Sequence, residues 1–311
     1  MSAPVWSGWL PPESLALLAA ATWATASLFS AAASARMGAF AFTRWRMVFA
    51  ALLLWSMALA TGQWRSLWSD GGSAAWQAIG LLVLSGVIGI FVGDTALFAC
   101  MNRLGPRRSG LLFATHSLFT VVLAALFLDE SLKGWAMPGG VLLVGGVMAA
   151  IALGRREGAA HQLEATQGQL AAGVALGLLS ALGQSVGTLV LKPAMAAGLD
   201  PVAASAVRMT AGFACHALLW CTGLQMARVQ SALQWRDLAY TFASAALAMA
   251  VGMTLILKAL QHGSAGLVGM LSSVSPVLLL PLLWWRTGQR PAWGAWVGAA
   301  MAVVGCALIL A

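Results

Sequence analysis

Charged side chains are scarce in this chain of 311 residues. Asp, Glu, Lys and Arg make up only 8% of it, 60% of the residues are hydrophobic, and the mean hydropathy is +0.86. A soluble domain averages about 25% charged residues. Too few polar side chains are present to cover a surface exposed to water. The composition therefore excludes a soluble globular domain and predicts an integral protein of the lipid bilayer.

Signals of several other protein classes are also missing. The net charge of +8 comes from Lys and Arg that stand singly or in pairs between apolar runs, which is typical of membrane-flanking residues, so no nucleic-acid partner is expected. The amino terminus lacks a charged segment before its apolar stretch, so we expect no cleaved signal peptide there. No cofactor, metal site or disulfide is predicted, because the four cysteines lie in apolar segments without metal-type spacing: Cys100, Cys215, Cys221 and Cys306.

Reactive pairs are absent from the apolar segments too. The chain has no H-x-x-x-H motif, no paired carboxylates and no Ser-His pair with a third acid in the same span. We therefore expect no catalytic residues and no enzymatic activity. An intramembrane transferase and a non-transporting receptor or scaffold remain as alternatives from other classes.

What the chain has in abundance is apolar segments of about 20 residues, the length that spans a bilayer. Ten such segments are predicted, at residues 13–35, 41–61, 75–101, 109–128, 135–153, 170–196, 202–223, 238–260, 265–285 and 293–310.

The chain also repeats itself, since residues 92–151 align without a gap on residues 251–310, 159 positions later. Five spans per half is an odd number, so the second half must enter the membrane from the opposite side. The sequence thus predicts an all-α integral membrane fold of ten transmembrane helices arranged as two inverted five-helix repeats. We place the repeats at 13–153 and 170–311, with a polar linker at 154–169.

Polar side chains inside the spans are the candidate site residues, because a charge in hydrocarbon costs at least about 2.5 kcal/mol and needs a cavity or a partner. The repeat makes Ser275 in the ninth span equivalent to His116 in the fourth. We expect five residues to contact a small-molecule substrate, and two of them, Asp94 and His116, to be able to couple a proton. The five are Trp23, Asp94, His116, Gln184 and Ser275. For these residues a purely structural role, such as an ion pair or a buried hydrogen-bonded side chain, stays open.

Other intramembrane residues favour structural roles. Glycine pairs at four-residue spacing predict close helix packing, whereas Pro276 and Pro281 predict a gating bend in the ninth span. Arg46 and Arg208 head the second and seventh spans in matching Arg-Met strings, where we expect helix-end anchoring, with anion binding as the alternative. His216 has no polar companion in its own span, so a structural role is expected.

These features resemble the EamA domains of the drug/metabolite transporter superfamily. The shared pattern has a basic residue heading the second span, a Ser-Pro pair in the fourth, a Gly-Glu pair after it and glycines in the fifth. It corresponds here to Arg46, Arg208, Ser275-Pro276, Glu130, Gly139, Gly146, Gly298 and Gly305. The chain departs from the pattern where His116-Ser117 replaces Ser-Pro, where Asp129 replaces the Gly before Glu130, and where Gln289 replaces the second Glu.

The resemblance implies a secondary transporter that exports small metabolites, amino acids foremost, across the inner (plasma) membrane by alternating access. Drugs, sugars and nucleotide derivatives are the alternative substrates. Basic residues concentrate in the odd-numbered loops, which would place the termini outside by the positive-inside rule. The resemblance implies cytoplasmic termini instead, so the orientation and the oligomeric state stay open.

Overall fold

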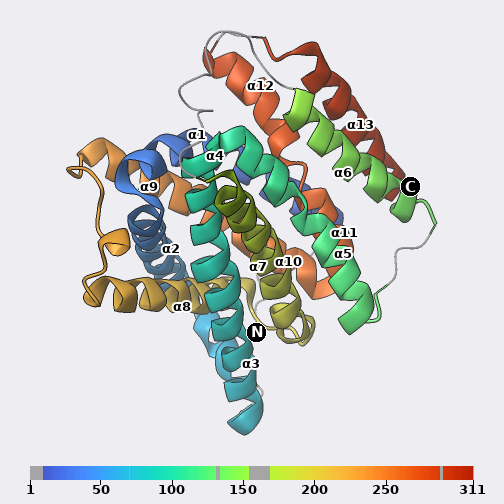
Figure 1. The fold of residues 1–311 in the computed structure, drawn as a ribbon. Coiled ribbons are helices and arrows are strands. Elements are labelled where there is room, and N and C mark those ends of the chain that lie inside the picture. Colours follow the sequence, from blue (N-terminus) through green and yellow to red (C-terminus); the bar gives the residue numbers. More distant parts are fainter. Residues whose placement is uncertain (1–9, 70, 131–133, 154–168, 288–289, 311) are drawn as a thin grey trace.

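The computed structural model describes residues 10–69, 71–130, 134–153, 169–287 and 290–310. In that part of the chain all regular secondary structure is helical (Figure 1). The predicted linker at 154–169 lies outside the described residues except for its last position, Gln169, and Gln289 lies outside them as well.

Ten helical stretches of the described residues are long and apolar enough to cross a membrane, which confirms the ten predicted spans. In the first half the helices are α1 (Pro12–Met37), α2 (Ala39–Thr61), α3 (Gly72–Ser85), η2 (Gly86–Asp94), α4 (Thr95–Ala114), α5 (His116–Phe127) and α6 (Ala136–Leu153). In the second half they are α7 (Leu170–Ala196), α8 (Pro201–Cys221), α9 (Trp235–Ser244), η4 (Ala245–Gly252), α10 (Met253–His262), α11 (Ala265–Ser272), α12 (Ser275–Thr287) and α13 (Trp293–Leu310). Two short 3-10 turns, η1 (Gln63–Trp68) and η3 (Gln225–Ala227), lie between spans.

The third and eighth spans share an irregularity at equivalent places. Each contains a π-helical stretch, η2 in the first half and η4 in the second, and their first residues, Gly86 and Ala245, are 159 positions apart. π-Helical turns are rare and occur often at functional sites, because the wider turn displaces the following side chains. The duplication seen in the sequence therefore extends to this local distortion.

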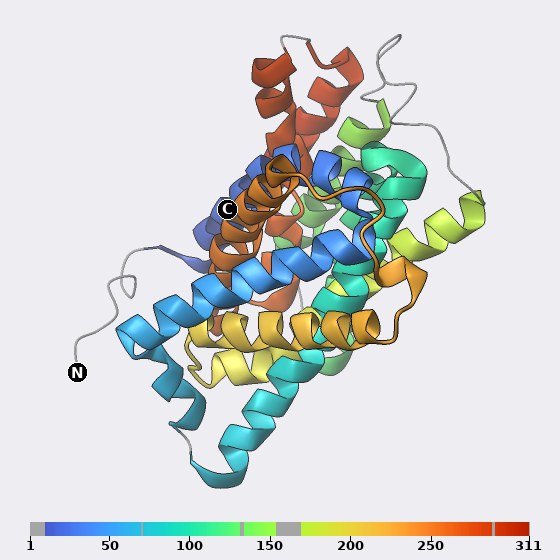
Figure 2. The ribbon, with the colours of Figure 1, turned by 90° about the vertical axis from the view of Figure 1, so that its left-hand side faces the viewer.

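The first helix of each half packs mainly against the opposite half. Helix α1 packs mainly on α9, η4, α10 and α12 of the second half, and α7 packs mainly on α3, η2, α4 and α5 of the first. Helices α2 and α8 lie against each other on one side of the bundle (Figure 2), while α6 and α13 pair at the opposite edge (Figure 1). The first span of each half thus completes the opposite half.

Glycines allow the closest of these contacts, as their spacing predicts. A Cβ placed on Gly187 of α7 would lie 2.9 Å from the Cα of Gly89 in η2, and one on Gly183 would lie 3.3 Å from the Cα of Gly93. These two predicted pairs therefore face each other across the interface between the halves.

The fourth and ninth spans are each broken at equivalent positions. Helix α4 is interrupted at Gly105 (φ 82°), so its first part ends the third span and its last part begins the fourth. In the fourth span α4 ends at Ala114 and α5 begins at His116; in the ninth, α11 ends at Ser272 and α12 begins at Ser275. In the ninth span the break precedes Pro276, which has no N–H to continue the helical hydrogen bonds. Pro281 lies inside α12.

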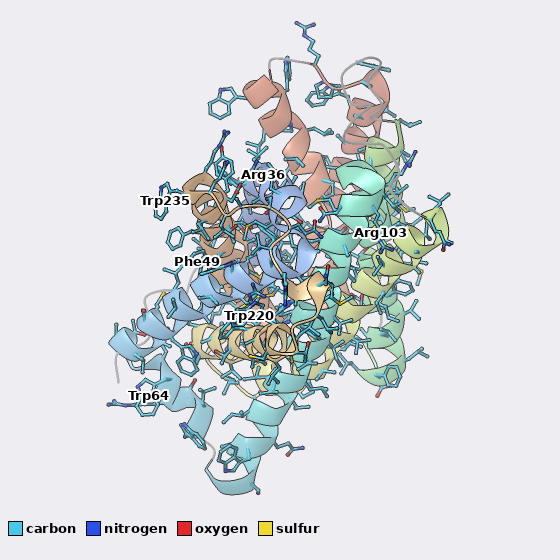
Figure 3. All side chains as sticks on the ribbon, turned by 60° about the vertical axis from the view of Figure 1, so that its left-hand side comes forward. Arg36, Phe49, Trp64, Arg103, Trp220 and Trp235 are labelled. Atoms are coloured by element: carbon cyan, nitrogen blue, oxygen red, sulfur yellow. The ribbon has the colours of Figure 1, made fainter. Side chains whose placement is uncertain are left out.

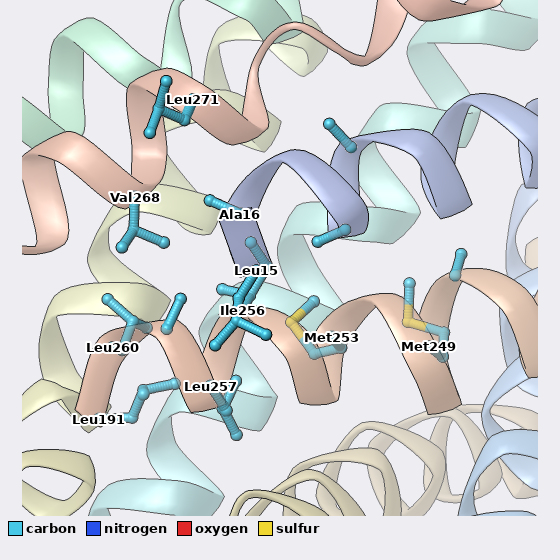
Figure 4. Close-up of a cluster of buried hydrophobic side chains, with 14 of the residues drawn as sticks. Leu15, Ala16, Leu191, Met249, Met253, Ile256, Leu257, Leu260, Val268 and Leu271 are labelled. Carbon is cyan, nitrogen blue, oxygen red and sulfur yellow. The ribbon is translucent and has the colours of Figure 1, made fainter. Parts of the chain in front are cut away.

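An apolar core fills the region where α1 meets the second half. Figure 4 shows side chains of α1, α7, α10 and α11 converging there, among them Leu15, Leu191, Ile256, Leu260 and Val268. Most tryptophans of the described residues lie instead on the outside of the bundle, as Trp64 and Trp235 show in Figure 3. This distribution is expected of helices anchored at the membrane interface.

Candidate functional site

Three charged side chains are buried together between the halves. Arg46 of α2, Asp94 at the end of η2 and Arg208 of α8 are only 5%, 6% and 1% exposed. Nη1 of Arg46 donates a hydrogen bond of 3.1 Å to Oδ2 of Asp94 and forms an ion pair with it. Arg208 packs against the same helical stretch, since a Cβ on Gly89 of η2 would lie 3.4 Å from its Nη2. The predicted site residue Asp94 is therefore paired with one arginine, and a second arginine, from the other repeat, lies against η2.

The guanidinium groups are not fully hydrogen-bonded by the described residues. Nε of Arg46, and both Nε and Nη1 of Arg208, are buried without any hydrogen-bond partner there. Arg46 is instead flanked by the rings of Phe42 and Phe98, whose centroids lie 5.9 and 5.2 Å from its Cζ atom. Aromatic faces attract a cation but accept no ordinary hydrogen bond.

Both arginines lie inside their helices, whereas the sequence suggested positions at the helix ends. Residue 46 lies seven positions into α2, which begins at Ala39, and residue 208 lies seven positions into α8, which begins at Pro201. Seven residues correspond to about 10 Å of helix. The expected helix-end anchoring is therefore wrong for both.

His216 of α8 has a polar partner in the other half of the molecule. Its Nε2 atom lies 3.0 Å from Oγ1 of Thr95, the residue that follows Asp94. The rings of Phe40 and Phe91 pack edge-on against the imidazole, with centroids at 6.1 and 4.8 Å. The contact extends the polar centre from α8 to the start of α4.

Trp23 connects α1 to the π-helical stretch of the eighth span. Its indole Nε1 donates a hydrogen bond of 3.0 Å to the backbone carbonyl of Ala248 in η4. A Cβ on Gly252 would lie 2.7 Å from that nitrogen, so the indole sits directly against the backbone at the end of η4. The indole ring therefore connects α1 of the first half to η4 of the second half.

Gln184 and His116 are brought together through α7. Gln184 is buried, and its backbone nitrogen lies 3.4 Å from where a Cβ on Gly93, next to Asp94, would be. The neighbouring Ser185 donates a hydrogen bond of 2.7 Å to the carbonyl of His116, whose ring packs 4.9 Å from that of Phe113. Gln184, Asp94 and His116 thus belong to one group of packed helices, α7, η2 and α5.

Ser275 lies with Trp23 in the equivalent second group. It begins α12, which packs on α1, and α1 in turn packs on η4. The structure therefore places the five predicted residues in two groups related by the repeat. It does not bring all five side chains into mutual contact.

The described residues contain no cluster of three or more His, Cys, Asp or Glu side chains able to hold a metal ion. The polar groups that the structure does bring together at this centre are the Arg46–Asp94 ion pair and the contact of His216 with Thr95.

The fold and its buried polar centre define the class as a multi-pass membrane protein of two inverted repeats, an architecture of secondary transporters. The model of the EamA-like transporter family matches residues 10–152 and 171–311. The chain belongs to the EamA-like transporter family, within the drug/metabolite transporter superfamily, as the sequence resemblance implied.

Structural comparison supports the same fold. A solved structure described as "Crystal structure of protein" is similar over 96% of this chain and 95% of its own, with a TM-score of 0.75 and 18% sequence identity. Identity at this level shows a shared fold alone. No curated protein matches the chain.

Proposed function

We propose that this membrane transporter exports amino acids across the inner (plasma) membrane by alternating access, as a secondary transporter with repeats at 13–153 and 170–311. The observation that carries the proposal is the placement of the polar side chains on two equivalent helix groups, α7–η2–α5 and α1–η4–α12. Those of the first group are buried, and Trp23 and Ser275 of the second group are partly buried. Indole N–H, amide, imidazole and carboxylate groups suit a zwitterionic solute with an organic side chain. In this proposal Trp23, Asp94, His116, Gln184 and Ser275 contact the substrate.

The contacts between the halves support a mechanism of alternating access. At the odd-numbered loops Arg36 pairs with Asp237 at 3.0 Å. At the opposite end Oε2 of Glu130 accepts hydrogen bonds of 2.6 and 3.4 Å from the N–H groups of Ala265 and Gly266. Polar contacts thus hold both ends of the interface, and each set has to open in turn for a solute to cross. The helix breaks before His116 and Pro276 are the proposed bending points, and Asp94 or His116 is the proposed proton-coupling group.

Uptake by proteoliposomes tests the proposal. The purified full chain is assayed with labelled amino acids, sugars and nucleotides, with and without a pH gradient. We expect saturable amino-acid uptake that His116→Ala reduces at least about tenfold, a loss equal to about 1.4 kcal/mol of binding or barrier energy. His262→Ala is the matched control, because His262 is exposed at the end of α10. Failure of folded wild-type protein to transport any amino acid would overturn the proposal.

A further inference from the structure

The charged centre carries a surplus positive charge. Arg46 and Arg208 contribute two positive charges and Asp94 one negative charge, so the buried cluster has a net charge of +1. His216 hydrogen-bonds with Thr95 beside the cluster and is a further titratable group there. An uncompensated charge in the interior of a membrane protein is costly unless it has a partner or a function.

The surplus charge belongs chiefly to Arg208. Asp94 is hydrogen-bonded to Arg46, whereas two donors of Arg208, Nε and Nη1, have no acceptor among the described residues. The Arg208 backbone is held tightly, because a Cβ on Gly86 of η2 would lie 2.5 Å from its carbonyl oxygen. A Cβ on Gly89 would lie 3.4 Å from Nη2, so this glycine leaves room for the guanidinium. Helix packing therefore fixes an arginine two of whose donors, Nε and Nη1, have no acceptor among the described residues.

A purely structural guanidinium would be expected to have its donors satisfied. Buried polar groups in native proteins are nearly always hydrogen-bonded, and leaving one without a partner costs about 1–3 kcal/mol. Arg44, two residues before Arg46, shows the usual arrangement, since its Nη1 donates a hydrogen bond of 2.7 Å to the carbonyl of Ala227. The unsatisfied donors of Arg208 therefore indicate a ligand that binds there reversibly.

We propose that Arg208, assisted by Arg46, binds the carboxylate group of the transported solute. This inference rests on the proposed transport function: it assigns the carboxylate of the transported amino acid to Arg208, and it predicts that a carboxylate ligand of net charge −1 binds this site more tightly than a zwitterion. A carboxylate supplies two acceptor oxygens that match guanidinium donors, and a single negative charge neutralises the cluster. A phosphate monoester, with nearly two negative charges, would leave a surplus negative charge.

The positions of the two arginines suit a site reached from both sides. Helices α2 and α8 are equivalent spans of inverted repeats, so they run in opposite directions. Arg46 therefore lies about 10 Å from one end of the pair formed by α2 and α8, and Arg208 lies about 10 Å from the other end. Asp94 of η2 pairs with Arg46, and Gly89 of η2 lies against the guanidinium of Arg208, so the anion site lies along η2. The donors are buried in this structure, so the ligand enters when one end of the interface opens.

Ligand binding to the full chain in detergent tests the proposal, with isothermal titration calorimetry as the readout. Three probes differ in charge but share one side chain: 4-methylpentanoate, L-leucine and L-leucinamide. We expect 4-methylpentanoate to bind most tightly, leucine more weakly, and leucinamide, which has no carboxylate, not to bind.

Arg208→Gln should weaken 4-methylpentanoate binding at least about tenfold, because hydrogen bonds to a charged group are lost. Arg44→Gln, which removes a positive charge outside the cluster, should leave the affinity unchanged.

Two further measurements separate binding from folding. Arg208→Gln should unfold at a temperature equal to or above that of the ligand-free wild type, because it removes an unpaired buried charge. Asp94→Asn, which raises the net charge of the cluster to +2, should bind 4-methylpentanoate more tightly than the wild type, because the competing carboxylate is gone. Absence of this gain in Asp94→Asn, or equal binding of leucinamide and 4-methylpentanoate, would overturn the carboxylate site.

Failure of this proposal differs from failure of the transport function. If the wild type transports amino acids and Arg208→Gln transports and binds them equally well, the carboxylate site is wrong and the transport function stands. If the wild type binds 4-methylpentanoate through Arg208 but transports no solute, the site stands and the transport function is wrong.

Discussion

At the scale of single residues, Asp129 shows how a departure from the family pattern is accommodated. It is the one non-glycine residue of the described chain with a positive φ, 53°, in the turn after α5. The EamA pattern has glycine at this position, and glycine adopts a left-handed conformation without steric cost. Asp tolerates this region better than most residues because its short side chain can hydrogen-bond locally.

Replacing Asp129 should therefore change stability in opposite directions according to the residue introduced. Asp129→Gly is expected to raise the free energy of unfolding by about 0.5–1 kcal/mol, because it removes the left-handed strain. Asp129→Val should lower it by about 1 kcal/mol or more, since a β-branched side chain is strained at positive φ. Denaturant unfolding in mixed micelles measures both variants, and a more stable valine variant would contradict the argument.

Single residues also show where sequence reasoning about the site reached its limit. Asp94 was predicted correctly to be an exceptional buried charge, but its partners lie in α2 and α8 and no spacing along the chain indicates them. His216 lacked a polar companion in its own span and has one, Thr95, in the other half. The only signal that linked Arg46 to Arg208 was their matching Arg-Met strings, which report equivalence but not proximity.

At the scale of elements, glycine spacing predicted which helix faces meet. In the edge pair α6 and α13, a Cβ on Gly146 would meet the backbone nitrogen of Ala302 and lie 2.7 Å from the carbonyl of Gly298. A Cβ on the adjacent Gly145 would meet nothing within 4 Å. Gly146 therefore has no room for a side chain, whereas its sequence neighbour Gly145 has.

Alanine substitutions test this distinction with a matched pair. Gly146→Ala should destabilise the protein by about 1–3 kcal/mol, because the added methyl group forces two helix backbones apart. Gly145→Ala should be neutral or stabilising by up to about 1 kcal/mol, because alanine has the higher helix propensity. Thermal unfolding of the purified variants in detergent measures both, and equal effects would show that the contact between α6 and α13 does not depend on Gly146.

The elements themselves were largely predictable, whereas their distortions were not. Hydropathy located all ten spans because the bilayer fixes their length and composition. The π-helical stretches η2 and η4 left no signal of their own, since ordinary residues form them where tertiary contacts favour the wider turn. The repeat showed that the two spans are equivalent, and the structure was needed to show this shared distortion.

At the scale of the whole molecule, the contacts that join the halves differ at the two ends. Glu130 reaches across to the first N–H groups of α11, where the partial positive charge of the helix end favours a carboxylate. At the other end Arg36 pairs with Asp237, and Ser231 donates a hydrogen bond of 2.7 Å to the carbonyl of Arg36. The two ends of the interface can therefore be perturbed independently.

Glu130→Ala should loosen only the end that contains α11. We expect the amides of Ala265 and Gly266 to exchange with solvent at least about threefold faster, because they lose a charged acceptor. Hydrogen exchange with mass spectrometry measures the change, and Glu130→Gln, which keeps an acceptor oxygen, should change exchange less. Peptides from α6 serve as an internal reference. Unchanged exchange at Ala265 in Glu130→Ala would show that Glu130 does not hold this end closed.

The crossed packing of the halves has a consequence for biosynthesis. Helix α1 leaves the ribosome long before most of its neighbours, because α9, η4, α10 and α12 belong to the last third of the chain. Nascent chains lengthen at roughly 5–20 residues per second, so α1 waits about ten seconds or more in the bilayer before those partners exist. During that interval its helix-packing face is covered by lipid, insertase or an unrelated span. Helix α1 is therefore synthesised early but packed late. Truncated chains that end before the eighth span have an α1 without its main partners.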